Sequence, residues 1–299
     1  AVTGVAGLHR GGKEVTVKAP AVVIATGGFG ANVAYRQEVN TGVWKDVVLD
    51  DRIGCTNIKP CAQGDGLTMA SAIGAELIDM QYIQTYPTCD PETGALLYVD
   101  DMRLESRAIM VNKEGDRFVE ELDRRDVLSN AIKSQTGGMG YMLWNQAAAD
   151  ETGLLKQHAD EYDNLEKRGI IVKADTLEEA AAHFEIDADE LKKTVERWNQ
   201  FAKDGKDTDF NYRADLFTID AGPYYLNSYK PAVHYTMGGL HITTNAEVLD
   251  ESGAAIPGLY AAGEVAGHKM GTNRLGSCSM ADIYTFGRIA GDQAANFVG

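Results

Sequence analysis

The sequence predicts an α/β protein whose parallel sheet is interrupted by an inserted α+β domain. Two short apolar runs, residues 21–30 and 254–264, end in small residues and glycine. Such runs are typical of strands buried on both faces of a parallel sheet. Residues 82–225 instead carry local helix and strand patterns without strand–helix repetition. We therefore expect residues 1–81 and 226–299 to form one domain and residues 82–225 to form a second, smaller one.

The first segment predicts a hairpin, a strand and a helix in that order. Two β-branched runs flank the turn at residues 10–13, as in a hairpin entered midway, so we expect a further piece upstream. The glycines after the strand at 21–30 turn the chain at its carboxyl end, where open α/β sheets bind ligands. Gly64-Asp65-Gly66 then opens a helix whose amino terminus either faces a polar cofactor group or is only a structural turn.

The middle and last segments predict two further helices and a second strand–turn–strand. Residues 108–119 have this pattern, with the turn at 112–115. Asp187 resembles the N-cap of a helix with one apolar face, whose residues we expect in the core; they are Leu191, Val195, Trp198 and Phe201. The chain closes with the strand at 254–264 and a helix at 279–295 whose small residues allow tight packing on the sheet.

Composition excludes several classes of function. The 299 residues carry a formal net charge of −16, which disfavours nucleic acid and anionic membrane surfaces. An anionic substrate must therefore be bound locally by a few arginines and histidines. The four cysteines form no CxxC pair, so we expect no zinc site, no other metal site and no disulfide framework. No apolar run approaches the length of a membrane span.

One stretch carries the strongest chemical signal. Residues 234–239 read His-Tyr-Thr-Met-Gly-Gly, and Glu264 and Arg274 follow further along the chain, again among glycines. His234 and Arg274 can both bind a carboxylate, and the glycines let the backbone approach a planar cofactor. This combination indicates redox chemistry on a small unsaturated acid.

Taken together, these motifs resemble the flavoprotein family of fumarate reductase, succinate dehydrogenase and soluble flavocytochrome c. The similarity extends over nearly the whole chain, in the family's order, at residues 25–28, 64–66, 234–239, 258–264 and 273–276. It implies an FAD-binding Rossmann-like domain, incomplete because the amino-terminal GxGxxG part is missing, with an inserted capping domain. Residues 1–81 and 226–299 would be the FAD-binding parts and 82–225 the capping, substrate domain. The resemblance favours a separate amino-terminal flavoprotein piece as an obligate partner.

The resemblance also implies which residues contact the flavin. They are Ala25, Thr26, Gly27, Gly28, Asp65, Tyr235, Glu264, Arg274, Ser277, Ser279 and Met280. Cys278 and Ser279 replace residues that are often Asn and Ala or Ser in the family, which would tune these contacts. An electron donor, haem or FMN on another domain or chain, is a further implied partner. Many relatives of this character work outside the cytoplasmic membrane, which favours an extracytoplasmic location.

Catalytic roles follow from the same resemblance. The family uses flavin N5 as hydride donor. His234 and Arg274 match the residues that bind the substrate carboxylate, with Thr236 and Gly239 beside them. Arg125, immediately before Asp126, matches the arginine that donates the proton. Arginine is a very weak acid in water, so it must be reloaded through a relay. Candidate relay members are Asp101, Arg103 and Glu105. Arg124 would be a solvated neighbour, and a one-residue shift in the match would exchange the roles of Arg124 and Arg125.

The far end of the substrate site departs from the fumarate reductases. Their histidine is replaced by Tyr86, and their Thr-Glu pair falls on Asp100 and Asp101. An aspartate and a phenol would repel a second carboxylate and accept an imidazole N–H. The exchange resembles the branch of the family that reduces urocanate to imidazole propionate.

Several alternatives stay open. Tyr86 could merely stack while Asp101 serves the proton relay, which would suit fumarate or a cinnamate-like, acrylate-like or other enoate. The enzyme could also run in reverse as a dehydrogenase, because direction depends on flavin potential. A non-catalytic half of a split flavoprotein is the third possibility.

Overall fold

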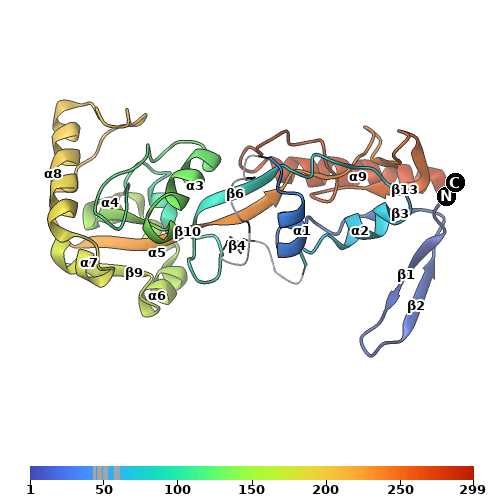
Figure 1. The fold of residues 1–299 in the computed structure, drawn as a ribbon, viewed down its shortest axis with the longest axis horizontal. Coiled ribbons are helices and arrows are strands. Elements are labelled where there is room, and N and C mark those ends of the chain that lie inside the picture. The colour runs from blue at the N-terminus through green and yellow to red at the C-terminus, as the bar shows by residue number, and fades with distance from the viewer. Residues whose placement is uncertain (43–44, 46–48, 50–52, 57–60) are drawn as a thin grey trace. The chain divides into compact units, whose positions relative to one another are not determined.

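The computed structural model describes residues 1–42, 45, 49, 53–56 and 61–299. These divide into two compact units: unit 1 comprises Ala1–Gln84 and Val233–Gly299, and unit 2 comprises Thr85–Ala232. Both sequence boundaries between the units fall inside a strand: the first within β6 (Ile83–Cys89) and the second within β10 (Tyr224–Thr236). Figure 1 labels the elements.

Unit 1 contains a hairpin, a small sheet and three helices. Its strands are β1 (Gly4–Leu8), β2 (Glu14–Lys18), β3 (Val22–Ile24), β4 (Gly54–Cys55), β5 (Leu77–Ile78), β11 (Gly239–Leu240), β12 (Glu247–Leu249) and β13 (Ala255–Ala261). Its helices are α1 (Val33–Glu38), α2 (Asp65–Ser71) and α9 (Cys278–Val298). The predicted hairpin is confirmed: β1 and β2 pair antiparallel, with Leu8 opposite Glu14.

Strands β3 and β13 form the parallel pair that the sequence predicts. Leu259 lies opposite Val22 and Ala261 opposite Ile24, and β12 pairs antiparallel on the other edge of β13. Alternate residues of β13 belong to different cores: Leu259 packs with Leu67 of α2, whereas Tyr260 packs with Ala290 of α9. Because side chains alternate along a strand, the two helices cover opposite faces of this sheet.

The expectation that the strand at 21–30 is buried on both faces is wrong. Val23 is 40% exposed, and only Ile24 of β3 is buried. Among the described residues β3 is the terminal strand of its sheet, and α9 buries only Asp282 and Ala290. The α9 face of β3 therefore lacks the cover that a central strand would have.

Unit 2 is built on a sheet in which β8 (Gly140–Asn145) pairs antiparallel with both β7 (Ile109–Val111) and β10. Strands β9 (Ile171–Ala174) and β6 also pair with β10. Its helices are η1 (Val99–Met102), α3 (Arg125–Lys133), η2 (Thr136–Gly138), α4 (Gln146–Thr152), α5 (Leu154–Gln157), α6 (Ala159–Lys167), α7 (Leu177–His183) and α8 (Ala188–Asp204). The two faces of the sheet carry separate cores. Met142 and Trp144 pack with α3 to α6, and Tyr141 and Leu143 pack with α7 and α8.

The predicted α8 is confirmed from its cap to its buried face. The Asp187 side chain accepts hydrogen bonds from the backbone N–H groups of Asp189 and Glu190, as an N-cap does. The expected strand–turn–strand at 108–119 is only partly formed, because its second arm is reduced to one bridge at Arg117. The Arg117 side chain is instead drawn into a buried ion pair with Glu121 and Asp207.

No described helix is both long and apolar enough to cross a membrane. All four cysteines are free thiols.

Candidate active site

In unit 1, the residues that follow β3 pack against Thr236 and Glu264. Gly28 is buried, and a Cβ there would lie 2.1 Å from Thr236 Oγ1 and 2.3 Å from Glu264 Oε1. Glu264 Oε1 accepts hydrogen bonds from Thr236 N at 2.9 Å and Thr236 Oγ1 at 3.0 Å. Burial raises the pKa of Glu264, against the effect of these bonds and of Arg274. The structure thus brings together three of the predicted flavin and substrate residues.

Arg274 lies against Tyr235 with its guanidinium carbon 4.6 Å from the ring centre. Arg274 is only 6% exposed, and its Nε has no hydrogen-bond partner among the described residues. Within the described part of the chain, its Nη1 makes long contacts of 3.4 Å to Leu275 O and Ser279 Oγ. A buried guanidinium with unused donors fits an anionic or carbonyl acceptor supplied by a ligand.

Gln84 and Thr56 position the two predicted carboxylate-binding residues. The Gln84 Nε2 donates to Asn273 Oδ1 and to Arg274 O, both at 2.6 Å, and so holds the backbone of this loop. His234 is half-buried, and its Nδ1 lies 2.8 Å from Thr56 Oγ1, which orients the ring. Neither Gln84 nor Thr56 was singled out from the sequence, because no local pattern marks a side chain that contacts a distant loop.

The other predicted flavin contacts lie at the ends of short segments in unit 1. Ala25 and Thr26 are exposed, and Gly27 has a positive φ of 77° with open space on its Cβ side. Asp65 is the exposed first residue of α2 and follows Gly64, whose φ is 81°. At the start of α9, Ser277 and Met280 are exposed and Ser279 is half-buried. Most of these side chains are exposed and therefore accessible to a ligand, and their flavin contacts stay a prediction.

Gly239 has a structural explanation in this unit. A Cβ at this position would lie 2.3 Å from Val265 O and 2.8 Å from Gly267 N. Glycine is therefore required at position 239 for close packing of β11 on the backbone of residues 265–267. The predicted contact of Gly239 with substrate stays a prediction.

The ion pair of Lys269 and Asp282 was missed by the sequence analysis. Lys269 Nζ donates to Asp282 Oδ1 at 2.5 Å and to Gly263 O at 3.0 Å, and both side chains are more than nine-tenths buried. Burial lowers the pKa of Lys269, and Asp282 opposes that effect. The pair therefore links the turn before Glu264 to α9. Both of these segments contain residues that are predicted to contact the flavin.

In unit 2, Arg125 and Tyr86 are in contact. The Arg125 guanidinium carbon lies 4.8 Å from the Tyr86 ring centre, and Tyr86 is only 8% exposed. Arg124 differs: its side chain is 70% exposed and pairs with Asp126 at 2.7 Å. Burial raises the pKa of the Tyr86 phenol, and the charges of Arg103 and Arg125 act in the opposite direction.

The turn η1 brings acidic residues beside this pair. Burial raises the pKa of Asp101, and the nearby Arg103 opposes it. Arg103 is 4% exposed, donates from Nη1 to Glu121 O at 2.9 Å and leaves Nε without a partner among the described residues. Glu105 is exposed. Asp100, which received no role from the sequence, is the more deeply buried member of the acidic pair, at 1% exposure.

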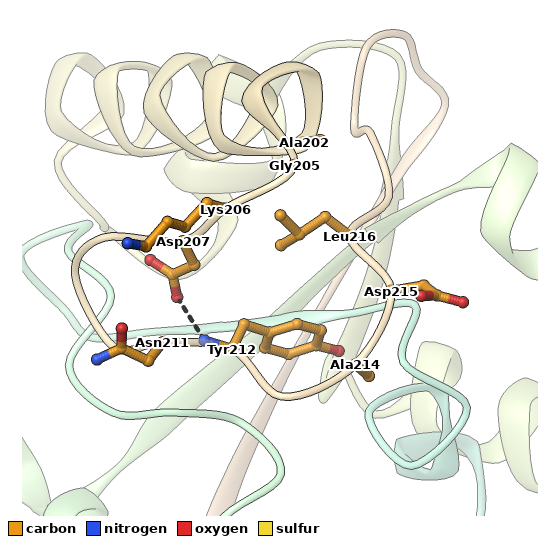
Figure 2. A pocket seen from close by; sticks show the side chains of 9 residues that line it. All are labelled: Ala202, Gly205, Lys206, Asp207, Asn211, Tyr212, Ala214, Asp215 and Leu216. Carbon is orange, nitrogen blue, oxygen red and sulfur yellow. Dashed lines mark hydrogen bonds between the residues drawn. The ribbon is translucent and has the colours of Figure 1, made fainter.

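A separate pocket in unit 2 contains none of the predicted residues. This pocket has a volume of about 380 Å³. Figure 2 shows its lining side chains beyond the end of α8, among them Lys206, Asn211 and Asp215. Its Asp207 is a structural residue, because the carboxylate accepts bonds from Arg117 and from Tyr212 N. The described part of the chain holds no cluster of three His, Cys, Asp or Glu suited to a metal ion.

Fold and site define a flavoprotein: residues 1–280 match the family model described as "FAD binding domain", and the chain belongs to that family. FAD is therefore its cofactor. The chain is 59% identical over 284 residues to urocanate reductase of Eggerthella lenta, covering 95% of this chain and 46% of that protein. It is 41% identical to NADH:acrylate oxidoreductase of Vibrio harveyi, covering 99% of this chain and 29% of that protein.

A solved structure gives the same fold. The open conformation of a flavocytochrome c3 fumarate reductase matches with a TM-score of 0.79 and 36% identity, over 95% of this chain and 47% of that one. The predicted family and fold class are thereby confirmed. The chain spans less than half the length of each of these three relatives.

Proposed function

We propose that this chain carries the catalytic side of an FAD-dependent reductase that converts urocanate to imidazole propionate. The observation that carries the proposal is the 59% identity to a urocanate reductase, against 41% to an acrylate oxidoreductase. Tyr86 and Asp101, the two residues that distinguish this sequence from the fumarate reductases, lie in unit 2 with Arg125.

Each end of the substrate has its own residues in this proposal. His234 and Arg274 bind the carboxylate, and the buried, unpaired Arg274 Nε supports this role. Tyr86 and Asp101 bind the imidazole, whose N–H a carboxylate accepts. Together they would orient the double bond and exclude a second carboxylate.

Proton delivery is assigned to Arg125. FAD, when bound, supplies the hydride to one carbon of the double bond. Arg125 gives its proton to the other carbon and is reloaded from solvent through a relay, for which Asp101, Arg103 and Glu105 are the candidates. Half-burial and contact with the Tyr86 ring hold Arg125 in place, whereas the neighbouring Arg124 is exposed and paired. Proton transfer by a positioned side chain contributes about 10²–10⁴-fold to rate.

Residues 82–225 would act as the capping domain and residues 1–81 and 226–299 as the FAD-binding parts. The proposed partner is an amino-terminal flavoprotein piece that completes the FAD site. Support comes from the uncovered edge of β3, where an apolar groove of about 210 Å³ is lined by Val22 and Ile24 and by the exposed Met69 and Ile73. A strand paired with β3 would cover this edge. A haem or FMN electron donor is the second proposed partner.

The test is reoxidation of the reduced flavin by candidate substrates. We expect rapid reoxidation by urocanate and slow reoxidation by fumarate. Turnover with fumarate but none with urocanate would remove the substrate assignment. Acrylate is the second candidate, favoured by the Vibrio harveyi relative, and is measured in the same assay. Flavin content of the chain purified with and without the remainder of a relative's FAD domain tests the partner.

A further inference from the structure

Asp100 and Asn227 form a buried pair with two polar atoms left over. Asn227 Nδ2 donates to Asp100 Oδ1 at 2.7 Å, and the two residues are 0–1% exposed. The other two atoms of these groups, Asp100 Oδ2 and Asn227 Oδ1, are buried and have no hydrogen-bond partner among the described residues. Ser228 O lies at the longer distance of 3.5 Å from the same Nδ2.

Two unpaired acceptors in a buried site are costly, and one proton satisfies both. We propose that Asp100 is a neutral carboxylic acid whose Oδ2–H donates to Asn227 Oδ1, so that the two side chains form a cyclic pair. This pair is a positioning device: it fixes η1, the turn that presents Asp101, to β10. The inference rests on the proposed function only for the role of Asp101.

The surroundings of Asp100 favour the neutral form. Burial raises its pKa to about 8; the Asn227 bond and the charge of Arg103 act against this, and Glu161 and Asp101 act with it. Glu161 on α6 is held close by accepting bonds from Tyr98 N and Val99 N at the start of η1.

The other elements around the turn add little charge. The phenols of Tyr229 on β10 and Tyr86 on β6 both have raised pKa values and stay neutral, with burial as the main cause. On α4 and α5, which also pack against η1, Glu151 is paired with Arg107 and Lys156 is exposed.

A neutral Asp100 leaves Asp101 as the single negative charge of the turn. Above about pH 8, ionisation of Asp100 removes the donor to Asn227 and places a second charge beside Asp101. We therefore expect urocanate binding to weaken as pH rises through this value, through displacement of the turn.

The first test is the thermal stability of the full chain with Asp100→Asn. An asparagine can reproduce both hydrogen bonds of the pair without a titrating group. The pKa of Asp100 is near 4 in the unfolded chain and about 8 in the folded chain, so the contribution of Asp100 to wild-type stability falls with rising pH between these values. We expect the melting temperature of D100N, relative to wild type, to increase steadily from about pH 5 to about pH 8.

Asp207→Asn is the matched control, because Asp207 is equally buried but paired with Arg117. D207N should be less stable than wild type across this range. If D100N loses stability as D207N does, or if its advantage does not grow with pH, Asp100 is ionised and the proposal is wrong.

Two further readouts separate this device from a purely structural role. The infrared spectrum of wild type minus D100N should contain the carbonyl stretch of a protonated carboxyl near neutral pH. A carboxylate band in its place would overturn the proposal. In the FAD-loaded protein, the alkaline rise of KM for urocanate should disappear in D100N while kcat near pH 7 is retained. A loss of kcat in D100N would show that the charge of Asp100 is needed. If wild type does not reduce urocanate, the substrate proposal fails, while the stability and infrared tests still decide the state of Asp100.

Discussion

Arg125 lies over the Tyr86 ring at 4.8 Å, whereas its neighbour Arg124 pairs with Asp126 at the surface. Arg125 is the first residue of α3 and Arg124 is its N-cap. These adjacent residues therefore have different environments, because Arg125 contacts a buried ring and Arg124 is exposed to solvent. This contact places the proposed proton donor beside one of the two proposed specificity residues.

Replacing Arg125 by Ala should abolish proton delivery while leaving substrate binding largely intact. We expect kcat to fall by about 10²–10⁴-fold, the usual contribution of a positioned proton donor. Stopped-flow reoxidation of reduced flavin measures it. Arg124→Ala is the control and should retain wild-type kcat. Equal losses in both variants, or substantial turnover in R125A, would remove Arg125 from its role.

Replacing Asp101 by Asn should change which acid is reduced. Asparagine keeps the size of the side chain but loses the charge that accepts the imidazole N–H. A hydrogen bond to a charged group contributes about 1.5–3 kcal/mol, so kcat/KM for urocanate should fall about ten- to a hundredfold. Steady-state kinetics with urocanate and fumarate measure this. An unchanged ratio between the two substrates would show that Asp101 does not determine specificity.

The buried pairs of Arg117 should dominate the stability of unit 2. Arg117 contacts Glu121 at 2.7 Å and Asp207 at 3.1 Å, and all three side chains are at most 5% exposed. Arg117→Met leaves two buried acids unpaired, and we expect a loss of about 3–5 kcal/mol in the free energy of unfolding. Urea denaturation at neutral pH measures this free energy. The control is Arg197→Met, because Arg197 is exposed. Similar losses in R117M and R197M would contradict this view.

Acid should weaken the same cluster. Burial opposes ionisation of Asp207, but hydrogen bonds from Arg117 and Asp209 N outweigh it and lower its pKa. A lowered pKa means that the contribution is complete above the ordinary aspartate value of about 3.9 and is lost as pH falls through the folded value. Melting temperatures of wild type and D207N should therefore converge below about pH 4. A constant difference down to acid pH would contradict the assignment.

Lys269→Met should release the turn before Glu264 from α9. Removing one partner of a buried pair leaves Asp282 uncompensated, which costs about 3–5 kcal/mol. We expect both a lower melting temperature of the chain and weaker FAD retention after gel filtration. Lys269→Arg, which keeps the charge, should recover part of both. Normal FAD retention in a destabilised K269M would limit the pair to a structural role.

Local patterns in the sequence determined much of this protein. Alternating β-branched residues around a glycine turn specified the β1–β2 hairpin, and an N-cap followed by a helical apolar face specified α8. The motifs around His234, Glu264 and Arg274 resemble those of the flavoprotein family, and this resemblance led to the family that the comparison confirms.

Only the tertiary structure decided which of these side chains are buried and what they contact. Asp100 and Asn227 are 127 residues apart, and nothing local in either segment marks the pair. The exposure of Val23 likewise depends on which elements cover β3, although its own sequence resembles a central strand. The physical reason is the same in both cases: burial and protonation depend on the groups that folding brings from distant parts of the chain.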